Sequence, residues 1–174
     1  MNAKNSVLLK NAECFIKNNF NKLDIYIKNN LIHKIDTNIN IKTENTYDCT
    51  GLTIFPGFID TQVHFREPGN PEKETLESGS KSAVLGGITS VFEMPNTSPP
   101  TDTKENFEDK LNRAKNRMFC NYAFYFGATP DNSEELATLK TLDGCCGVKL
   151  FAGSSTGTLL VHKEEDIEKV FEST

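Results

Sequence analysis

The stretch GFIDTQVHFREPG, residues 57–69, carries Asp60, Gln62, His64 and Arg66 at every second position. Because side chains alternate between the two faces of a β-strand, this spacing predicts a strand that places all four on one face. A neutral imidazole is a common metal ligand, and a guanidinium can bind a carboxylate through two hydrogen bonds. The stretch therefore predicts a metal-and-anion site on a strand that ends near residue 65.

After residue 56 the chain alternates between strand-like and helix-like segments. Further strands are predicted over residues 88–94, 120–128 and 145–153, and helices over residues 74–87, 103–116, 133–142 and 164–172. This alternation predicts a parallel sheet wrapped by helices. A complete (β/α)₈ barrel takes about 250 residues, so the roughly 120 residues here make about half of one. We expect the N-terminal portion of such a barrel within a longer protein, and an open four-stranded α/β domain is the alternative.

The first 55 residues have a different pattern. Residues 6–16, 22–35 and 47–55 are rich in β-formers and are separated by polar turns, of which Asn29-Asn30 suits a tight hairpin. His33 in the return strand is expected at the surface or half-buried. We predict a small β-subdomain over residues 1–55 and the barrel portion over residues 56–174.

Composition rules out several classes of protein. The 174 residues carry a net charge of −5 without a cluster of Lys and Arg, which argues against a nucleic-acid surface. No apolar run is long enough to span a bilayer, and the first residues lack a signal-peptide core. Five cysteines without a C-x-x-C pair favour reduced thiols in a cytoplasmic protein.

Chemically useful side chains stand where the predicted strands end. His64 and Arg66 follow the first strand, Asn96 follows the second, and Lys149 lies in the fourth. Catalytic groups of a (β/α)₈ barrel gather at this end of the strands. Asn96 can donate to the same anion as Arg66, whereas a buried Lys149 would have to be paired or chemically altered. The alternative to a binding site is that His64 is a packed structural residue and that Lys149 extends its charged end to solvent.

Residues from about 52 to 157 resemble the amidohydrolase superfamily, and most closely dihydroorotase. PGFIDTQVHFREPG is similar to that family's metal-binding signature, in which Asp-x-His-x-His is followed by Arg. FEMPNTSP resembles its second signature, and GVKLFAGSSTG resembles the segment with a lysine that becomes a carbamate between two metals. The first strands resemble the small β-subdomain that these enzymes build.

The resemblance implies a role for each matching residue. His64 becomes a metal ligand, Lys149 the bridging carbamate, and Arg66 and Asn96 the groups that hold the substrate carboxylate. The implied cofactor is one or two divalent metal ions, with zinc as the first choice. Because both Arg66 and Asn96 are retained, dihydroorotate is favoured over the rings of allantoinase-like and hydantoinase-like enzymes.

Two departures from the family pattern affect the site. Gln62 stands where the family has a second histidine, and its amide oxygen is a weaker zinc ligand than an imidazole nitrogen. A single metal, two metals with one loosely held, or no metal are all open. The family's later histidines and its catalytic aspartate have no match, and His162 comes too early to replace them.

The expected function is therefore that of a metal-dependent cyclic amidohydrolase. It would open and close the ring between dihydroorotate and N-carbamoyl-aspartate in pyrimidine biosynthesis, and the 174 residues alone are expected to show negligible activity. A non-catalytic scaffold subunit, a partner of aspartate transcarbamoylase, and a hydantoinase-like or allantoinase-like enzyme are the alternatives. The resemblance also implies a small-molecule substrate and a possible homodimer.

Overall fold

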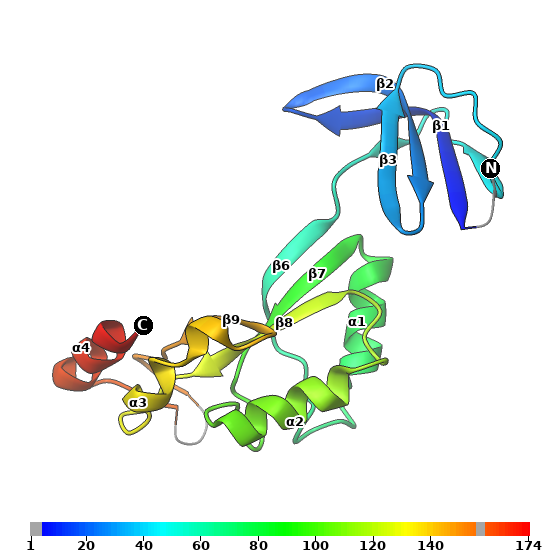
Figure 1. Cartoon of the computed structure of the whole chain (residues 1–174). Coiled ribbons are helices and arrows are strands. Elements are labelled where there is room, and N and C mark those ends of the chain that lie inside the picture. Colours follow the sequence, from blue (N-terminus) through cyan, green and yellow to red (C-terminus); the bar gives the residue numbers. More distant parts are fainter. Residues whose placement is uncertain (1–4, 156–158) are drawn as a thin grey trace. The chain divides into compact units, whose positions relative to one another are not determined.

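The computed structural model describes residues 5–155 and 159–174 and divides the chain into two compact units, Met1–Pro56 and Gly57–Thr174 (Figure 1). They are called unit 1 and unit 2 below.

Unit 1 is a five-stranded sheet. Its strands are β1 (Ser6–Ile16), β2 (Asn19–Lys28), β3 (Leu31–Asp36), β4 (Asn45–Asp48) and β5 (Thr53–Ile54). The order is β3-β2-β1-β4, with β5 also pairing with β1; β1, β2 and β3 run antiparallel, and β4 and β5 run parallel to β1. Ala12, Cys14, Ile25 and Cys49 form the small core between them.

Asparagines make most of the sharp turns. Asn29 and Asn30, with φ of 50° and 63°, connect β2 to β3, which confirms the hairpin predicted from the sequence. Six of the seven non-glycine residues with positive φ in the described residues are asparagines. Asparagine tolerates this left-handed region better than most residues, because its short side chain can hydrogen-bond to the local backbone.

Asp24 is a buried carboxylate in unit 1. It accepts hydrogen bonds from the backbone N–H groups of Asn11 and Ile39, each at 2.9 Å, and lies 3.7 Å from Nζ of Lys10. Burial acts to raise the pKa of Asp24, but these hydrogen bonds and Lys10 outweigh it and hold the pKa below its usual value. Asp24 therefore joins β2 to the bend in β1 and to the segment that follows β3.

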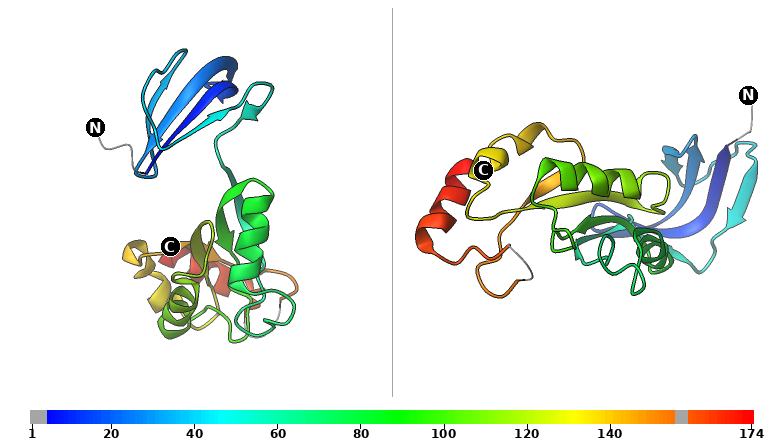
Figure 2. Two further views of the ribbon diagram at one scale, coloured as in Figure 1. Left: turned by 90° about the vertical axis from the view of Figure 1, so that its right-hand side faces the viewer. Right: turned by 90° about the horizontal axis from the view of Figure 1, so that it is seen from below.

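Unit 2 has four parallel strands in the order β6-β7-β8-β9, with helices between them (Figures 1 and 2). The strands are β6 (Phe58–Val63), β7 (Ile88–Glu93), β8 (Asn121–Gly127) and β9 (Cys145–Lys149). The helices are α1 (Leu76–Leu85), α2 (Lys104–Ala114), α3 (Ser133–Leu136) and α4 (Glu164–Ser173). The parallel βα alternation predicted from the sequence is confirmed.

One face of this sheet packs against helices. Phe107 of α2 lies against Phe124 and Phe126 of β8, with ring centroids 6.4 and 6.1 Å apart, and all three side chains are fully buried. Phe92 and Tyr125 project from the other face of β7 and β8 and are only partly buried. The alternation along β7 and β8 therefore decides which side chains face α2.

Several predicted elements are divided or shorter in the structure. The strand predicted over residues 47–55 corresponds to β4 and β5, and the strand predicted over residues 145–153 ends at Lys149. The helix predicted over residues 133–142 is only α3 and a 3₁₀ turn at Leu139–Thr141. The side chain of Asn132 does not cap α3; its amide instead binds the backbone of Thr129, Asp102 and Gly127. The hydroxyl of Thr138 donates to the Glu135 carbonyl at 2.7 Å and so competes with the helical backbone pattern.

The first barrel strand is also shorter than predicted. β6 ends at Val63, and its register against β7 shifts between Asp60 and Val63. Oδ1 of Asp60 accepts the backbone N–H of Gln62 at 3.0 Å. Because this irregularity interrupts the strand, the alternation predicted through His64 and Arg66 does not extend to those two residues.

The described residues include no helix long and apolar enough to cross a membrane. All five cysteines are free thiols.

Candidate functional site

A cavity of about 350 Å³ lies where β6 and β7 end. The loop from β6 to α1 and the loop from β7 to α2 form most of its wall. The first contributes Arg66, Pro68 and Asn70, and the second contributes Asn96, Thr97 and Ser98. The carboxyl ends of the strands, where the sequence predicted a site, thus enclose one cavity lined by both Arg66 and Asn96.

His64 and Asn96 are in contact at this cavity. Nδ1 of His64 lies 2.9 Å from Oδ1 of Asn96. Because a carbonyl oxygen only accepts, this contact fits the neutral tautomer of His64 with a proton on Nδ1 and a lone pair on Nε2. The contact also uses the oxygen of the Asn96 amide, so that Nδ2 remains as a donor.

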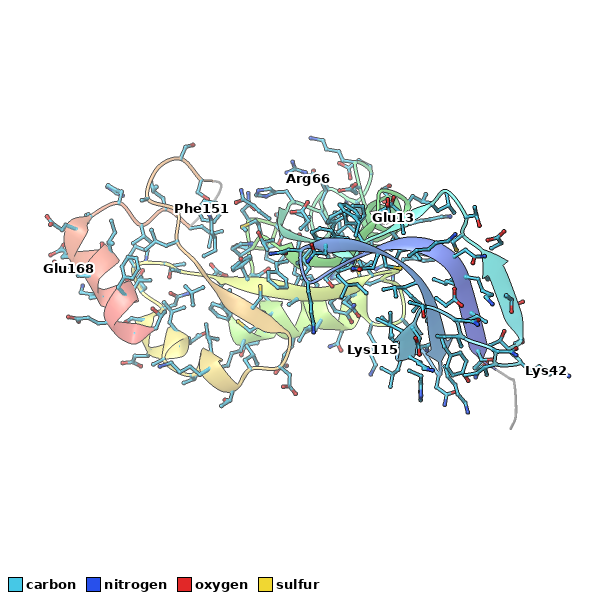
Figure 3. The ribbon with its side chains drawn as sticks, turned by 90° about the horizontal axis from the view of Figure 1, so that it is seen from above. Glu13, Lys42, Arg66, Lys115, Phe151 and Glu168 are labelled. Atoms are coloured by element: carbon cyan, nitrogen blue, oxygen red, sulfur yellow. The ribbon has the colours of Figure 1, made fainter. Side chains whose placement is uncertain are left out.

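Arg66 offers a positive charge that has no carboxylate partner among the described residues. Its side chain is exposed, and Figure 3 shows it at the surface of unit 2. A guanidinium in this state can bind an incoming carboxylate through two parallel hydrogen bonds.

Gly69, the last residue of REPG in the first loop, stands where only glycine fits well. Its φ is 116°, and a Cβ atom at this position would lie 2.9 Å from Cβ of Ser98. The backbone N–H of Ser98 donates to the Pro68 carbonyl at 3.2 Å, which joins the two loops directly. A side chain at position 69 would therefore adopt a strained conformation and push the loops apart.

Glu67 anchors the loop that carries Arg66. Its two oxygens accept Nη1 and Nη2 of Arg117 at 2.7 and 2.9 Å, and Oε2 also accepts the backbone N–H of Leu76 at the start of α1. The hydrogen bonds from Arg117, together with the Leu76 N–H, hold the pKa of Glu67 below its ordinary value of 4.5 although burial opposes this. Glu67 thereby fixes the loop between α1 and the segment after α2.

Glu67→Gln is expected to lower the free energy of unfolding of unit 2 by about 1–3 kcal/mol, because Arg117 loses its charged acceptor. Since the pKa of Glu67 is lower in the folded state, its stabilising effect is full above pH 4.5 and is lost as the pH falls through the folded value. The difference between wild type and variant should therefore narrow in acid. Urea unfolding at pH 7 and pH 3 measures this difference.

Glu77→Gln is the matched control. Glu77 also approaches Arg117, at 3.9 Å, but its side chain is 57% exposed. Its loss should change stability by about 0.5 kcal/mol or less. Equal effects of the two substitutions would contradict the role assigned to Glu67.

A fully buried ion pair lies beneath the other loop. Oε2 of Glu93, the last residue of β7, lies 2.5 Å from Nζ of Lys110 on α2, and both side chains are fully buried. Nζ of Lys110 also donates to the Met94 carbonyl and to Oγ1 of Thr101, each at 3.2 Å. Burial raises the pKa of Glu93 to about 7, and burial lowers that of Lys110.

Gln62 and Lys149 lie apart from this contact network. The Gln62 side chain is exposed on β6. Lys149 ends β9 and places Nζ 5.0 Å from the ring centroid of Phe151, and two strands separate β9 from β6. Thr156 and Gly157, the last residues of the motif around Lys149, lie outside the described residues.

Comparisons with known proteins agree on the family. Residues 51–159 match the family described as dihydro-orotase-like. The chain belongs to this family. A dihydroorotase of Methanosarcina mazei is 35% identical over 162 residues, which are 92% of this chain and 35% of that protein. An allantoinase of Deinococcus radiodurans is 33% identical over 86% of this chain and 33% of its own length.

A solved structure extends the likeness to the fold. An L-hydantoinase from Arthrobacter aurescens superposes with a TM-score of 0.87 at 27% identity, over 95% of this chain and 37% of its own. The prediction of an α/β fold, with a portion of a (β/α)₈ hydrolase barrel after a small β-subdomain, is thereby confirmed. This dihydro-orotase-like chain spans about a third of the length of the curated relatives it matches.

The metal implied by the dihydro-orotase-like family can be tested against the donor atoms present. Structural and catalytic zinc sites use three or four nitrogen, sulfur or oxygen ligands from the protein. The described residues contain no group of three or more His, Cys, Asp or Glu side chains that could hold a metal ion. His64 fits one ligand through Nε2, but the described part of this chain does not complete a zinc site.

Sequence reasoning missed both the partly buried pair of Glu67 and Arg117 and the fully buried pair of Glu93 and Lys110. Lys110 lies three residues after Phe107 and four before Ala114, on the apolar face of α2. A lysine at such a position was the available signal, because a buried ammonium requires a buried partner. No comparable signal indicated Arg117, since it follows the end of α2.

Proposed function

We propose that this dihydro-orotase-like chain forms part of a cyclic amidohydrolase that interconverts dihydroorotate and N-carbamoyl-aspartate in pyrimidine biosynthesis. Arg66 and Nδ2 of Asn96 would hold the substrate carboxylate. The supporting observation is that both residues line one cavity and that the Arg66 guanidinium has no carboxylate partner among the described residues. Holding the carboxylate would orient the ring before reaction, which is a large part of catalysis by positioning.

The proposal extends to metal binding. A divalent metal, zinc first, would take Nε2 of His64, with Gln62 and Lys149 as further predicted ligands. The hydrogen bond from Nδ1 to Asn96 supports this role of His64, because such a partner sets the tautomer and orientation of a ligating imidazole. The described residues alone do not complete a metal site.

Two other functions compete with this one. An allantoinase and an L-hydantoinase are among the relatives, and the rings of allantoin and hydantoin carry no carboxylate. A non-catalytic scaffold subunit would need no ligand at the cavity at all. An unpaired arginine beside a free amide donor favours the substrate with a carboxylate over both alternatives.

Orotate, the aromatic relative of dihydroorotate, is the probe for this proposal. We expect it to bind the chain, and Arg66→Met to weaken binding by about 10- to 150-fold, the loss of a charge-assisted contact. Isothermal titration calorimetry measures both affinities. Arg113→Met is the control, because Arg113 pairs with Asp109 on the exposed side of α2.

Each outcome of the titration is informative. Binding of hydantoin as tight as that of orotate would favour the hydantoinase-like alternative. Absence of orotate binding by the wild-type chain would overturn the carboxylate site. Orotate affinity that is unchanged in Arg66→Met would remove Arg66 from it.

The family resemblance also supports proposals for the domain boundaries, the location and the oligomeric state of the protein. We assign residues 1–55 to the small β-subdomain and residues 56–174 to the barrel portion. We place the protein in the cytoplasm as a homodimer that acts on a small molecule.

A further inference from the structure

The buried pair of Glu93 and Lys110 is poorly explained by stability alone. Both side chains are fully buried, and Oε1 of Glu93 has no hydrogen-bond partner in the part of the chain that the structure describes. Removing two charges from water is costly, and replacing such a pair by apolar residues of similar size is often neutral or stabilising. We therefore look for a function of this charged pair that an apolar pair of the same size could not perform.

Lys110 joins the pair to the loop that carries Asn96. Its Nζ lies within hydrogen-bonding distance of the Met94 carbonyl, Oγ1 of Thr101 and, at 3.5 Å, Oγ1 of Thr97. Met94 and Thr97 flank the segment Pro95–Asn96, and Thr101 stands where the loop returns to α2. One ammonium group thus binds the loop on both sides of Asn96.

The loop has other contacts besides those of Lys110. The backbone N–H groups of Thr97 and Thr101 both donate to the Pro95 carbonyl at 2.9 Å, and Nδ2 of Asn106 on α2 donates to the Pro100 carbonyl at 2.9 Å. The Asn106 contact lies four residues after Asn96, whereas Lys110 contacts Met94 and Thr97 on either side of Pro95–Asn96 and joins them to the end of β7. Asn96 in turn holds Nδ1 of His64.

We propose that Lys110 is a positioning residue for the candidate site, and that with Glu93 as its counter-ion it holds the β7–α2 loop so that Asn96 meets both His64 and the bound carboxylate. The inference rests on the proposed function for the carboxylate. The part of the inference that concerns the His64–Asn96 contact is independent of the proposed function, because this contact exists without a ligand. Lys110 itself does not touch the cavity ligand.

The double variant Glu93→Leu, Lys110→Met tests this idea. It removes both charges together, so the core keeps its packing while the loop loses its ties. The chain has three histidines, so long-range ¹H–¹⁵N NMR at pH 8 can show which ring nitrogen of His64 carries the proton. We expect Nδ1–H in the wild type, loss of that preference in the variant, and at least tenfold weaker binding of orotate.

Two further variants separate positioning from stability. Thr101→Val removes one acceptor of Lys110 and leaves the ion pair intact, so a smaller change of the same kind is expected even if the double variant fails to fold. Asp24→Asn destabilises unit 1, which carries none of the site residues, and should leave both readouts unchanged.

The outcomes distinguish this inference from the proposed function. A wild type without Nδ1–H on His64, or folded variants that keep both the tautomer and the wild-type affinity, would overturn the role of Lys110. If the wild type fails to bind orotate, the proposed function fails, and the His64 tautomer in the variants still decides whether Lys110 positions the loop.

Discussion

Lys110→Met alone is expected to lower the free energy of unfolding of unit 2 by about 3–5 kcal/mol, the usual loss when one partner of a buried ion pair is removed. The variant leaves the Glu93 carboxylate in the core without its counter-ion. Native-state hydrogen exchange of the β7 and β8 amides measures this loss, because it reports on unit 2 separately from unit 1.

The stability of the same variant should depend on pH more steeply than that of the wild type, with a definite sign. Burial already raises the pKa of Glu93 to about 7, and loss of Lys110 removes the charge that opposes this. A carboxyl group whose folded pKa is raised is best tolerated when protonated, so the variant should lose stability as the pH rises from 5 to 8.

Glu93→Leu in the same chain is the decisive control. It removes the unpaired carboxylate and should restore most of the lost stability. Arg113→Met, which breaks an exposed pair on the same helix, should change stability by about 0.5 kcal/mol or less. A loss below about 1 kcal/mol in Lys110→Met would contradict the buried-pair interpretation.

Phe107→Ala is the second large expected effect, a loss of about 3–5 kcal/mol from the stability of unit 2. The ring is fully buried between α2 and β8, where it contacts Phe124 and Phe126. Removal of the ring leaves a cavity between α2 and β8, and the closely packed core cannot move enough to fill it. Hydrogen exchange of the β8 amides again provides the measurement.

Phe171→Ala is the matched control for this deletion. Phe171 on α4 is 72% exposed, so the same chemical change should cost about 0.5 kcal/mol or less. Similar losses in the two variants would show that α2 does not depend on Phe107. Because α2 also carries Lys110, we expect Phe107→Ala to disturb the His64–Asn96 contact as well.

The regular elements of unit 2 could be predicted because their signals are local. The helix predicted over residues 74–87 is α1, which ends at Leu85 just before Gly86 and Gly87, and the strands from residue 88 onward follow their apolar runs. The extent of α3 could not be predicted, because Asn132 binds the backbone of distant residues instead of capping the helix. Such contacts depend on how the chain folds back, which the local sequence does not encode.

Motif spacing selected His64, Arg66 and Asn96 as candidate site residues, but not the contacts between them. In the structure Arg66 and Asn96 line one cavity, and His64 contacts Asn96. The irregularity between Asp60 and Val63 was not foreseeable, because a period of two assumes an unbroken strand. The dependence of Asn96 on Lys110 was also missed, since the two residues come from different elements.

The asparagines at the turns have a consequence for the gene. All glycine codons begin with two guanines, whereas asparagine codons begin with two adenines. Asparagine codons are therefore richer in adenine and thymine than glycine codons, and asparagine is a residue that left-handed positions accept readily. Turns such as that at Asn29 and Asn30 thus keep their left-handed backbone with codons that contain no guanine.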